Sequence, residues 1–315
     1  MLALVSRRLT GLLVTLLIVS LLIFAVMDLL PGDPASIMLG TSASPETLAA
    51  LRHDLGLDQP LILRYGRWLA GVLMGNLGQS YTYGVPVAGL VVERLAVTLP
   101  LALLAIALSM LIAIPLGVLA ASRRGGVADV VASVFSQIGI AVPAFWMALL
   151  LIVLFSTTLG LMPAGGFPGW SNGFWPALRA LLMPAVALAL PQAAVLTRVT
   201  RSAVLETLHE DFTRTALAKG LSARKVLWRH SVPNALVPIF TILGLQFTFL
   251  VAGAVLVENV FNLPGLGRLA YQALSQRDIV VMQDVILFFA ALVIIMNFLV
   301  DLSYLAIDPR LRKEL

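Results

Sequence analysis

The sequence contains no cysteine and few charged residues. Only 12% of its 315 residues are Asp, Glu, Lys or Arg, about half the share found in an ordinary soluble domain. The absence of cysteine excludes disulfides, zinc-thiolate sites and iron–sulfur clusters. With 60% hydrophobic residues and a mean hydropathy of +0.98, the chain has too few polar side chains to cover a soluble fold. Lipid is therefore predicted to be the solvent for much of it.

Motifs of nucleotide-binding and metal-dependent enzymes are also missing. No Gly-Lys pair occurs, which excludes a GxxxxGK[ST] phosphate loop. His209-Glu210 begins like HExxH, but Thr213 stands where the second histidine belongs. The three histidines lie in different segments. The sequence therefore predicts a non-catalytic chain that holds no cofactor and no metal of its own.

Six long apolar runs are present, and each reaches the roughly 20 residues that a helix needs to cross the hydrocarbon layer. The spans predicted from them cover residues 9–30, 96–121, 130–160, 179–200, 235–257 and 285–307. The first run is longer than a signal-peptide core and lacks a small-x-small cleavage site, so we expect a retained helix. The prediction is an all-α polytopic membrane protein, with residues 1–315 as a single transmembrane permease domain of six transmembrane helices.

Prolines in the third and fourth runs bear on how those spans are shaped and placed. Pro143 predicts a tilt or kink in the third, because proline lacks a backbone N–H and its ring clashes with the preceding turn. Pro184 and Pro191 in the fourth leave backbone carbonyls that need protein or water as a partner, which favours a pore-lining position. Proline is common in membrane helices generally, so a lipid-facing position stays open.

Lysine and arginine are unevenly distributed between the loops. With both termini inside, 14 of the 21 fall in cytoplasmic segments, which is the bias of the positive-inside rule. The sequence therefore predicts cytoplasmic N- and C-termini, an outer loop over residues 31–95 and a cytoplasmic loop over residues 201–234. The ionisable residues of the spans lie near the span ends, so no midplane group is available to couple transport to ions. Energy for transport is then expected to come from a partner.

The cytoplasmic loop has the pattern of two short helices with a break. The first is acidic at its start and basic at its end, which matches the helix dipole. Gly220 can take the left-handed conformation that closes a helix, and Ser222 can cap the next one. Ala216 and Gly220 near the bend would let another protein approach closely. Two interpretations remain from the pattern: a docking element, or a solvated basic loop that only fixes topology.

The same loop resembles a known family. Residues 214–221 (RTALAKGL) and then 230–233 (HSVP) resemble the EAA signature of ABC importer permeases, EAAxxxG followed after nine residues by IxLP. The chain has Arg214, His230 and Val232 where that signature has Glu, Ile and Leu, but it keeps the spacing and the Ala, Gly and Pro. The Arg-Thr-Ala version resembles the dipeptide, oligopeptide and nickel permease group.

The resemblance extends over nearly the whole chain. Further segments similar to that group are, in order, residues 31–35 (PGDPA), 55–60 (LGLDQP), 75–78 (GNLG), 261–267 (FNLPGLG), 277–278 (RD) and 308–310 (DPR). Each is weak alone. Together, at appropriate spacing, they resemble a permease subunit of the dipeptide importer type.

This resemblance implies a type I ABC importer permease fold in the bacterial cytoplasmic (inner) membrane. The chain would form half of a translocation path for di- or oligopeptides, paired as a heterodimer with a second homologous permease subunit. Two cytoplasmic ATPase subunits would bind ATP and Mg²⁺ and drive alternating access, and an extracytoplasmic solute-binding protein would deliver the substrate; nucleic acid is not among the partners. Relatives of this type also carry nickel, glutathione or other small solutes. A secondary carrier and a non-transporting scaffold are the competing classes.

The resemblance also implies site residues. Those expected to couple to the ATPases are Arg214, Thr215, Ala216, Lys219 and Gly220. Polar side chains within spans tend to face the bundle interior, and the path residues expected on this ground are Gln137, Gln192, Gln246, Thr248 and Asn297. Each glutamine is explained as well by a hydrogen bond between helices. Glu258 and Asn259 would gate the outer mouth or, as the favoured interpretation, simply contact water at the membrane interface.

Overall fold

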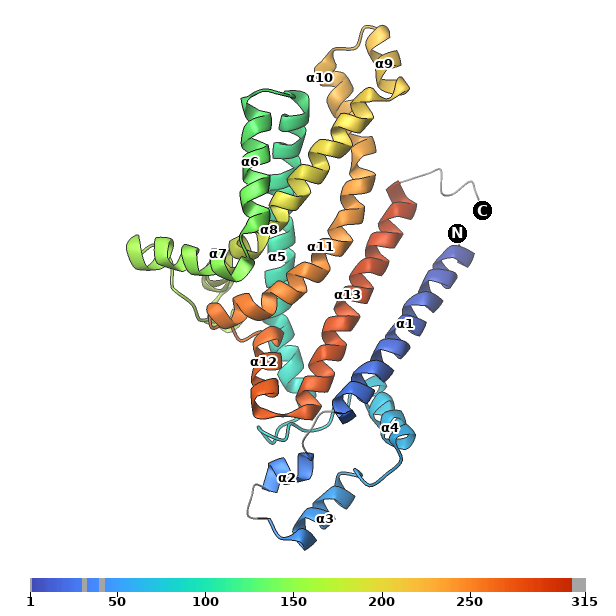
Figure 1. Cartoon of the computed structure of the whole chain (residues 1–315), viewed down its shortest axis with the longest axis vertical. Helices are drawn as coiled ribbons and strands as arrows, with labels where there is room; N and C mark the ends of the chain where they lie inside the picture. The colour runs from blue at the N-terminus through green and yellow to red at the C-terminus, as the bar shows by residue number, and fades with distance from the viewer. Residues whose placement is uncertain (1, 30–32, 40–42, 308–315) are drawn as a thin grey trace. The chain divides into compact units, whose positions relative to one another are not determined.

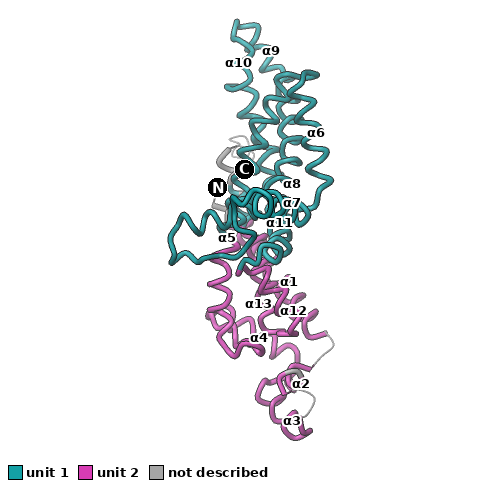
Figure 2. Tube along the Cα trace, turned by 90° about the vertical axis from the view of Figure 1, so that its left-hand side faces the viewer, with its two compact units in different colours: residues 1–5, 99–263, 296–315 teal, residues 6–98, 264–295 magenta. Residues whose placement is uncertain are grey.

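The computed structural model describes residues 2–29, 33–39 and 43–307, and these are almost wholly helical (Figure 1). Residues 31, 32 and 308–310, which carry part of the family resemblance, lie outside the described residues. The chain divides into two compact units (Figure 2). Unit 1 comprises the described parts of residues 1–5, 99–263 and 296–315, and unit 2 those of residues 6–98 and 264–295.

Five helices of the described chain are long and apolar enough to cross a membrane. They are α1 (Leu2–Leu29), α5 (Val87–Ser122), α8 (Phe174–His209), α11 (Val232–Val260) and α13 (Ile279–Ile307). Each contains most or all of one predicted span, and each extends beyond the predicted boundaries at one or both ends. An apolar run marks the depth of the hydrocarbon layer, and the helix continues into polar residues wherever its backbone hydrogen bonds continue.

The third predicted span is broken in two. Helices α6 (Val127–Ala141) and α7 (Ala144–Leu151), the latter continued by the π-helical η1 (Ile152–Thr158), are bent by 102° at residues 142–143. The kink predicted at Pro143 is therefore confirmed, and it divides the 130–160 run into separate helices. Proline disfavours helical backbone in the residue before it, and Val142 is extended, with φ −94° and ψ 116°. Counting the bent pair as one span gives six.

Helix α8 is the centre of unit 1. It packs against α6, α7 and α11, and its buried residues run along most of its length. Close approach depends on small residues: a Cβ at Gly139 of α6 would lie 2.5 Å from the Ala194 Cβ, and one at Gly117 of α5 would lie 2.6 Å from the Thr200 Cβ. Pro184 lies buried and Pro191 half-buried in α8, which continues through both.

Unit 2 contains short helices within the predicted 31–95 loop. These are α2 (Pro34–Leu39), α3 (Pro45–Asp54) and α4 (Leu61–Leu73), and α12 (Leu266–Gln276) lies in the same unit. Pro45 begins α3 and Pro60 precedes α4, as expected for residues that cannot continue a helix. Leu77, Val91, Leu266 and Val281 belong to the core of this unit.

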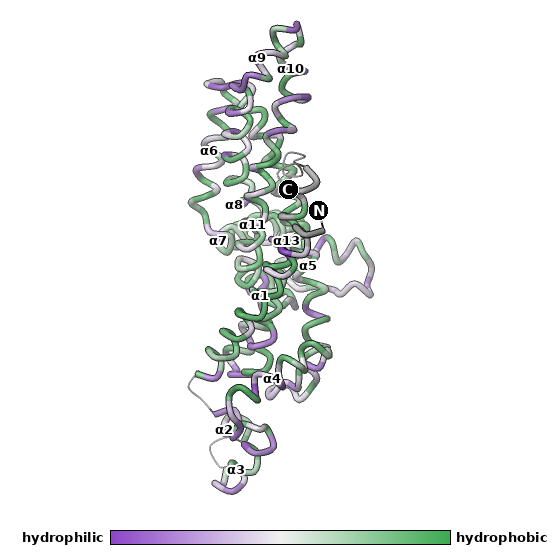
Figure 3. The backbone as a smooth tube through the Cα atoms, turned by 90° about the vertical axis from the view of Figure 1, so that its right-hand side faces the viewer, coloured by the Kyte–Doolittle hydropathy of each residue, from purple (hydrophilic) through white to green (hydrophobic). Residues whose placement is uncertain are grey.

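Hydropathy differs between the long helices and the short helical segment at α9 and α10. Figure 3 shows the long helices as predominantly hydrophobic and the segment around α9 (Asp211–Ala218) and α10 (Ala223–Val226) as mixed, with hydrophilic stretches. The polar segments therefore gather at helix ends and loops, where functional contacts with water-soluble partners are available.

Candidate functional site

The 201–234 loop forms the predicted helix–turn–helix. Helix α9 is followed by Gly220, whose φ of +84° is the left-handed conformation expected of it. The Gly220 N–H donates to the Leu217 carbonyl at 2.9 Å and the Leu221 N–H to the Ala216 carbonyl at 3.3 Å, which closes the helix. Ser222 stands at the N-cap of α10, but its side chain makes no capping hydrogen bond. The turn therefore depends on the glycine rather than on the serine.

The loop is anchored to the helices that carry it. Thr213 is fully buried, and its hydroxyl donates to the carbonyls of Leu208 at 2.9 Å and Glu210 at 2.6 Å. The Thr207 hydroxyl of α8 donates to the Ser231 carbonyl at 3.3 Å, across the base of the excursion. Leu227 is buried in a cluster with residues of α5, α8 and α11. The loop is therefore packed against the helices on either side of it.

Four of the five predicted coupling residues are exposed. Arg214 has 70% of its side chain exposed and forms an ion pair with Asp211 at 3.7 Å, while Thr215, Lys219 and Gly220 are also on the surface. Ala216 is buried instead, facing inward beneath the turn. Sequence reasoning missed the large apolar side chains of this segment, which are exposed at Phe212 (41%), Leu217 (48%) and Trp228 (54%). Apolar residues in an otherwise polar loop were the available signal.

The predicted path residues are not gathered in one place. Gln246 of α11 is buried, and its amide donates to the Gln192 carbonyl of α8 at 2.9 Å. Thr248 is half-buried, and Asn297 is exposed beside Gly244, where a Cβ would lie 3.0 Å from the asparagine Oδ1. Gln137 lines a separate pocket described next. Gln246 therefore makes the hydrogen bond between helices that was the alternative to a path-lining role.

A polar pocket of about 220 Å³ lies between α6 and α8 in unit 1. Its lining residues are Ala132, Ser133, Ser136, Gln137, Thr197, Arg198 and Arg201. Arg201 is ion-paired with Asp129, a contact between residues 72 positions apart that no motif in the sequence predicts. The lining brings Gln137, an expected path residue, together with Arg198 and Arg201, which the sequence analysis counted only in the charge bias of the loops.

The predicted outer-gate residues lie where α11 ends. Glu258 is fully buried, so the favoured expectation that it contacts water is wrong. The chain folds back there: the Leu263 N–H donates to the Glu258 carbonyl at 2.8 Å, and the Gly166 N–H to the Phe261 carbonyl at 2.7 Å. Asn259 is half-buried, and its amide donates to the Val255 carbonyl at 2.7 Å. The Glu258 carboxylate is therefore buried. Its position near the end of a predicted span did not indicate that burial.

Two buried carboxylates organise unit 2. Asp278 accepts hydrogen bonds from the Ser80 hydroxyl at 2.5 Å and the Thr82 N–H at 3.0 Å. Burial, and secondarily the charge of Asp278, raises the pKa of Tyr81 above its ordinary value. Asp284 of α13 is fully buried and accepts from the Trp68 indole N–H at 2.8 Å. These contacts tie the segment before α5 and helix α4 to the start of α13.

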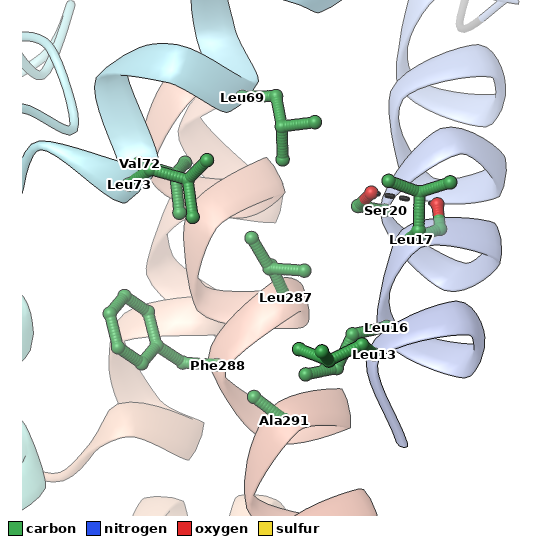
Figure 4. Close-up of a pocket in the computed structure, with 10 residues that line it drawn as sticks. All are labelled: Leu13, Leu16, Leu17, Ser20, Leu69, Val72, Leu73, Leu287, Phe288 and Ala291. Carbon is green, nitrogen blue, oxygen red and sulfur yellow. Dashed lines mark hydrogen bonds between the residues drawn. The ribbon is translucent and has the colours of Figure 1, made fainter. Parts of the chain in front are cut away.

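An apolar cavity of about 320 Å³ is also found in unit 2, between α1, α4 and α13. Figure 4 shows leucines of all three helices around it, among them Leu13, Leu69 and Leu287. The one hydroxyl in its lining, on Ser20, donates to the Leu17 carbonyl at 2.8 Å and is 2.9 Å from the Tyr65 hydroxyl. With no free polar group in the lining, the cavity suits hydrocarbon and not a peptide.

Comparison with protein families gives two matches that together span nearly the whole chain. Residues 113–313 match the family described as binding-protein-dependent transport system inner membrane component. Residues 1–102 match the N-terminal part described for the membrane component of the same kind of system.

Relatives are similar over their full length. A Brucella abortus protein named as a peptide transport system permease is 43% identical, with 100% of each chain covered. A Sinorhizobium fredii protein named as a peptide ABC transporter permease is 40% identical over 98% of each chain. The glutathione transport system permease GsiC of Salmonella typhi is 39% identical over 99% of each chain.

Solved structures share the fold. A chain of the MetNI methionine ABC transporter, in an inward-facing conformation, superposes with a TM-score of 0.57 at 20% identity, covering 70% of this chain and 96% of that one. A chain of an amino acid ABC transporter gives 0.53 at 19% identity, covering 68% and 92%.

Proposed function

The chain belongs to the family of inner membrane components of binding-protein-dependent transport systems and is a multi-pass permease subunit of an ABC importer, and on this premise we propose that it imports peptides. It forms half of the translocation path, and residues 1–315 act as one transmembrane domain. Relatives at 43% and 40% identity are named for peptide transport, which supports di- or oligopeptides as the substrate. The relative at 39% is named for glutathione, itself a tripeptide.

The observation that carries the assignment to an ATP-driven importer is the 201–234 loop, which is anchored at its base and exposed at its surface. Its exposed cations Arg214 and Lys219 lie on the same short segment as the exposed apolar side chains Phe212 and Leu217. A solvated loop that only fixed topology would need neither the apolar surface nor the buried threonine that holds it. Exposed apolar side chains rimmed by charge are typical of protein interfaces. The proposed partners at this surface are the ATPase subunits, which hold the ATP and Mg²⁺.

The orientation and the remaining partners follow from this assignment. Both termini and the 201–234 loop lie in the cytoplasm, in agreement with the distribution of Lys and Arg. The second half of the path is a homologous permease subunit, and a solute-binding protein delivers the peptide from outside. The chain itself is non-catalytic and holds no cofactor, since ATP hydrolysis takes place on the ATPase subunits.

The mechanism is a rigid transfer of motion. When the ATPase subunits close on ATP, the loop moves with them through Arg214, Thr215, Lys219 and Gly220 at its surface. The contacts of Thr213 and Thr207 transmit this movement to α8 and α11. Gln192 and Gln246, joined to one another, keep these two helices together as they move. Thr248 and Asn297 line the path, and Glu258 with Asn259 stiffens the turn at its outer end.

Reconstitution tests this proposal. The permease pair, the ATPase subunits and the binding protein are reconstituted with liposomes. Uptake of labelled dipeptides, longer peptides, glutathione and Ni²⁺ is then measured with and without ATP on the side of the membrane that carries the ATPase subunits. ATP-dependent accumulation of peptide is the expected result. Uptake that proceeds without ATP along an ion gradient would make the chain a secondary carrier, and ATP-driven uptake of Ni²⁺ alone would contradict the peptide assignment.

A further inference from the structure

The pocket between α6 and α8 carries more positive charge than its surroundings neutralise. Two arginines line it, and Arg201 is held by Asp129, with its Nε 2.5 Å from Oδ1 and its Nη2 3.0 Å from Oδ2. Arg198 is exposed, and no hydrogen bond or ion pair joins it to another of the described residues. One guanidinium at this pocket therefore remains to be paired.

A buried hydroxyl in the same pocket is also unpaired. Ser136 is 5% exposed, and its Oγ has no hydrogen-bond partner within the described part of the chain. Buried hydroxyl groups normally have a partner. Gln137 and Ser133, on the same edge of α6, add an amide and a second hydroxyl to the exposed side of the lining. An acceptor seated in the pocket would pair with both the Ser136 hydroxyl and the Arg198 guanidinium.

We propose that this pocket binds a carboxylate, namely the C-terminal carboxylate of the transported peptide as it passes through the permease. Arg198 supplies the cation, and Ser136 and Gln137 donate hydrogen bonds to the carboxylate oxygens. This inference rests on the proposed function, because it names the group of the substrate that α6 and α8 recognise.

The chemistry of the lining favours a carboxylate over other ligands. A guanidinium presents planar paired donors that match a carboxylate, whereas a cation would be repelled. The volume of about 220 Å³ is several times the roughly 30 Å³ that a water molecule occupies in the liquid, so a carboxylate with part of its residue fits. An arginine on a spanning helix normally faces a water-filled cavity or the bundle interior rather than lipid. Arg198 lies near the cytoplasmic end of the predicted span over residues 179–200 and its side chain is exposed, so an aqueous opening at that end of the path can reach it.

A phospholipid phosphate is the other oxyanion available to a membrane protein, and the experiment separates the two sources. The complete transporter without its binding protein is placed in nanodiscs of phosphatidylcholine, and binding of labelled Ala-Ala is measured by equilibrium dialysis. The C-terminal amide of Ala-Ala, which lacks the carboxylate, is the matched probe. Arg198→Gln is compared with Arg7→Gln, which removes an exposed arginine of α1 outside the pocket. Ser136→Ala provides a second variant that leaves the charge unchanged.

The expected result is binding of Ala-Ala and not of its amide, weakened about tenfold or more by Arg198→Gln, as for loss of a charge-assisted hydrogen bond. Ser136→Ala weakens it in the same direction, and Arg7→Gln leaves it unchanged. Equal binding of acid and amide, or binding indifferent to Arg198→Gln, overturns the proposal. Nanodiscs containing phosphatidylglycerol give the other arm: if Arg198→Gln alters only the retention of that lipid, the pocket holds a lipid phosphate and the proposal fails.

Uptake measured on the same preparations keeps this inference distinct from the proposed function. ATP-dependent peptide uptake together with binding indifferent to Arg198 leaves the function standing and removes the site. Binding of Ala-Ala that depends on Arg198, without any peptide uptake, supports the carboxylate site and removes the peptide assignment.

Discussion

Arg201 of α8 and Asp129 of α6 form a two-point ion pair, with Nε–Oδ1 at 2.5 Å and Nη2–Oδ2 at 3.0 Å. The Asp129 side chain is only 9% exposed and that of Arg201 31%. Asp129 also accepts the Gly125 N–H at 2.9 Å. One carboxylate therefore joins the turn before α6 to the central helix of unit 1.

The first prediction concerns this pair. Asp129→Asn removes the charge from a largely buried carboxylate and leaves Arg201 without its partner, so it is expected to cost about 1 to 3 kcal/mol of stability. Thermal unfolding of the purified complex measures the loss, and Asp129→Asn combined with Arg201→Gln should cost less than the two single changes added together. Strictly additive losses would contradict a direct coupling between the two side chains.

The second prediction separates two roles for Gln246. Its amide donates to the Gln192 carbonyl within the bundle, so Gln246→Leu should lower the free energy of unfolding by about 1 kcal/mol. Peptide uptake by the surviving complex should keep its KM, because the side chain is buried and its amide N–H is already donated within the bundle. A raised KM with unchanged thermal stability would instead make Gln246 a residue that contacts the substrate.

The third prediction lies in unit 2. Trp68 supplies the hydrogen bond recorded for the fully buried Asp284, whose Oδ2 has no partner among the residues described. Trp68→Phe keeps the ring contacts with Phe24 and Tyr65 but removes the N–H donor, with an expected cost of about 1 to 3 kcal/mol. Its effect on the thermal midpoint should shrink in an Asp284→Leu background. An undiminished effect there would assign the loss to ring packing alone.

Much of the fold is predictable from the sequence, because in a membrane the length of an apolar run follows from the thickness of the lipid. The break at Pro143 was expected from proline chemistry, but its angle of 102° was not, since the angle depends on how α7 packs against α8 and α11. The left-handed conformation of Gly220 was likewise a local property of the turn and was predicted correctly.

The contacts that build the sites could not be predicted in this way, because they join residues far apart in the chain. The pairs Asp129–Arg201 and Trp68–Asp284 are 72 and 216 positions apart, and no spacing rule connects them. Glu258 was expected in water because it lies near a span end, yet it is buried beneath the turn that follows α11. The exposure of Phe212 and Trp228 also needed the three-dimensional arrangement, since the same residues would serve equally well in a core.

The most direct test of the account is substrate-stimulated ATP hydrolysis by the complex that co-purifies with this chain, compared among wild type, Gly220→Asn and Gly220→Trp. A Cβ at Gly220 meets no atom within 4 Å, so a larger side chain projects outward, and asparagine tolerates the positive φ that strains tryptophan. We predict that wild type and Gly220→Asn bring down the ATPase subunits and hydrolyse ATP faster with loaded binding protein, whereas Gly220→Trp releases the subunits or abolishes the stimulation. Co-purification of no ATPase with wild type, or full stimulation in Gly220→Trp, would contradict the assignment of the 201–234 loop as the coupling element.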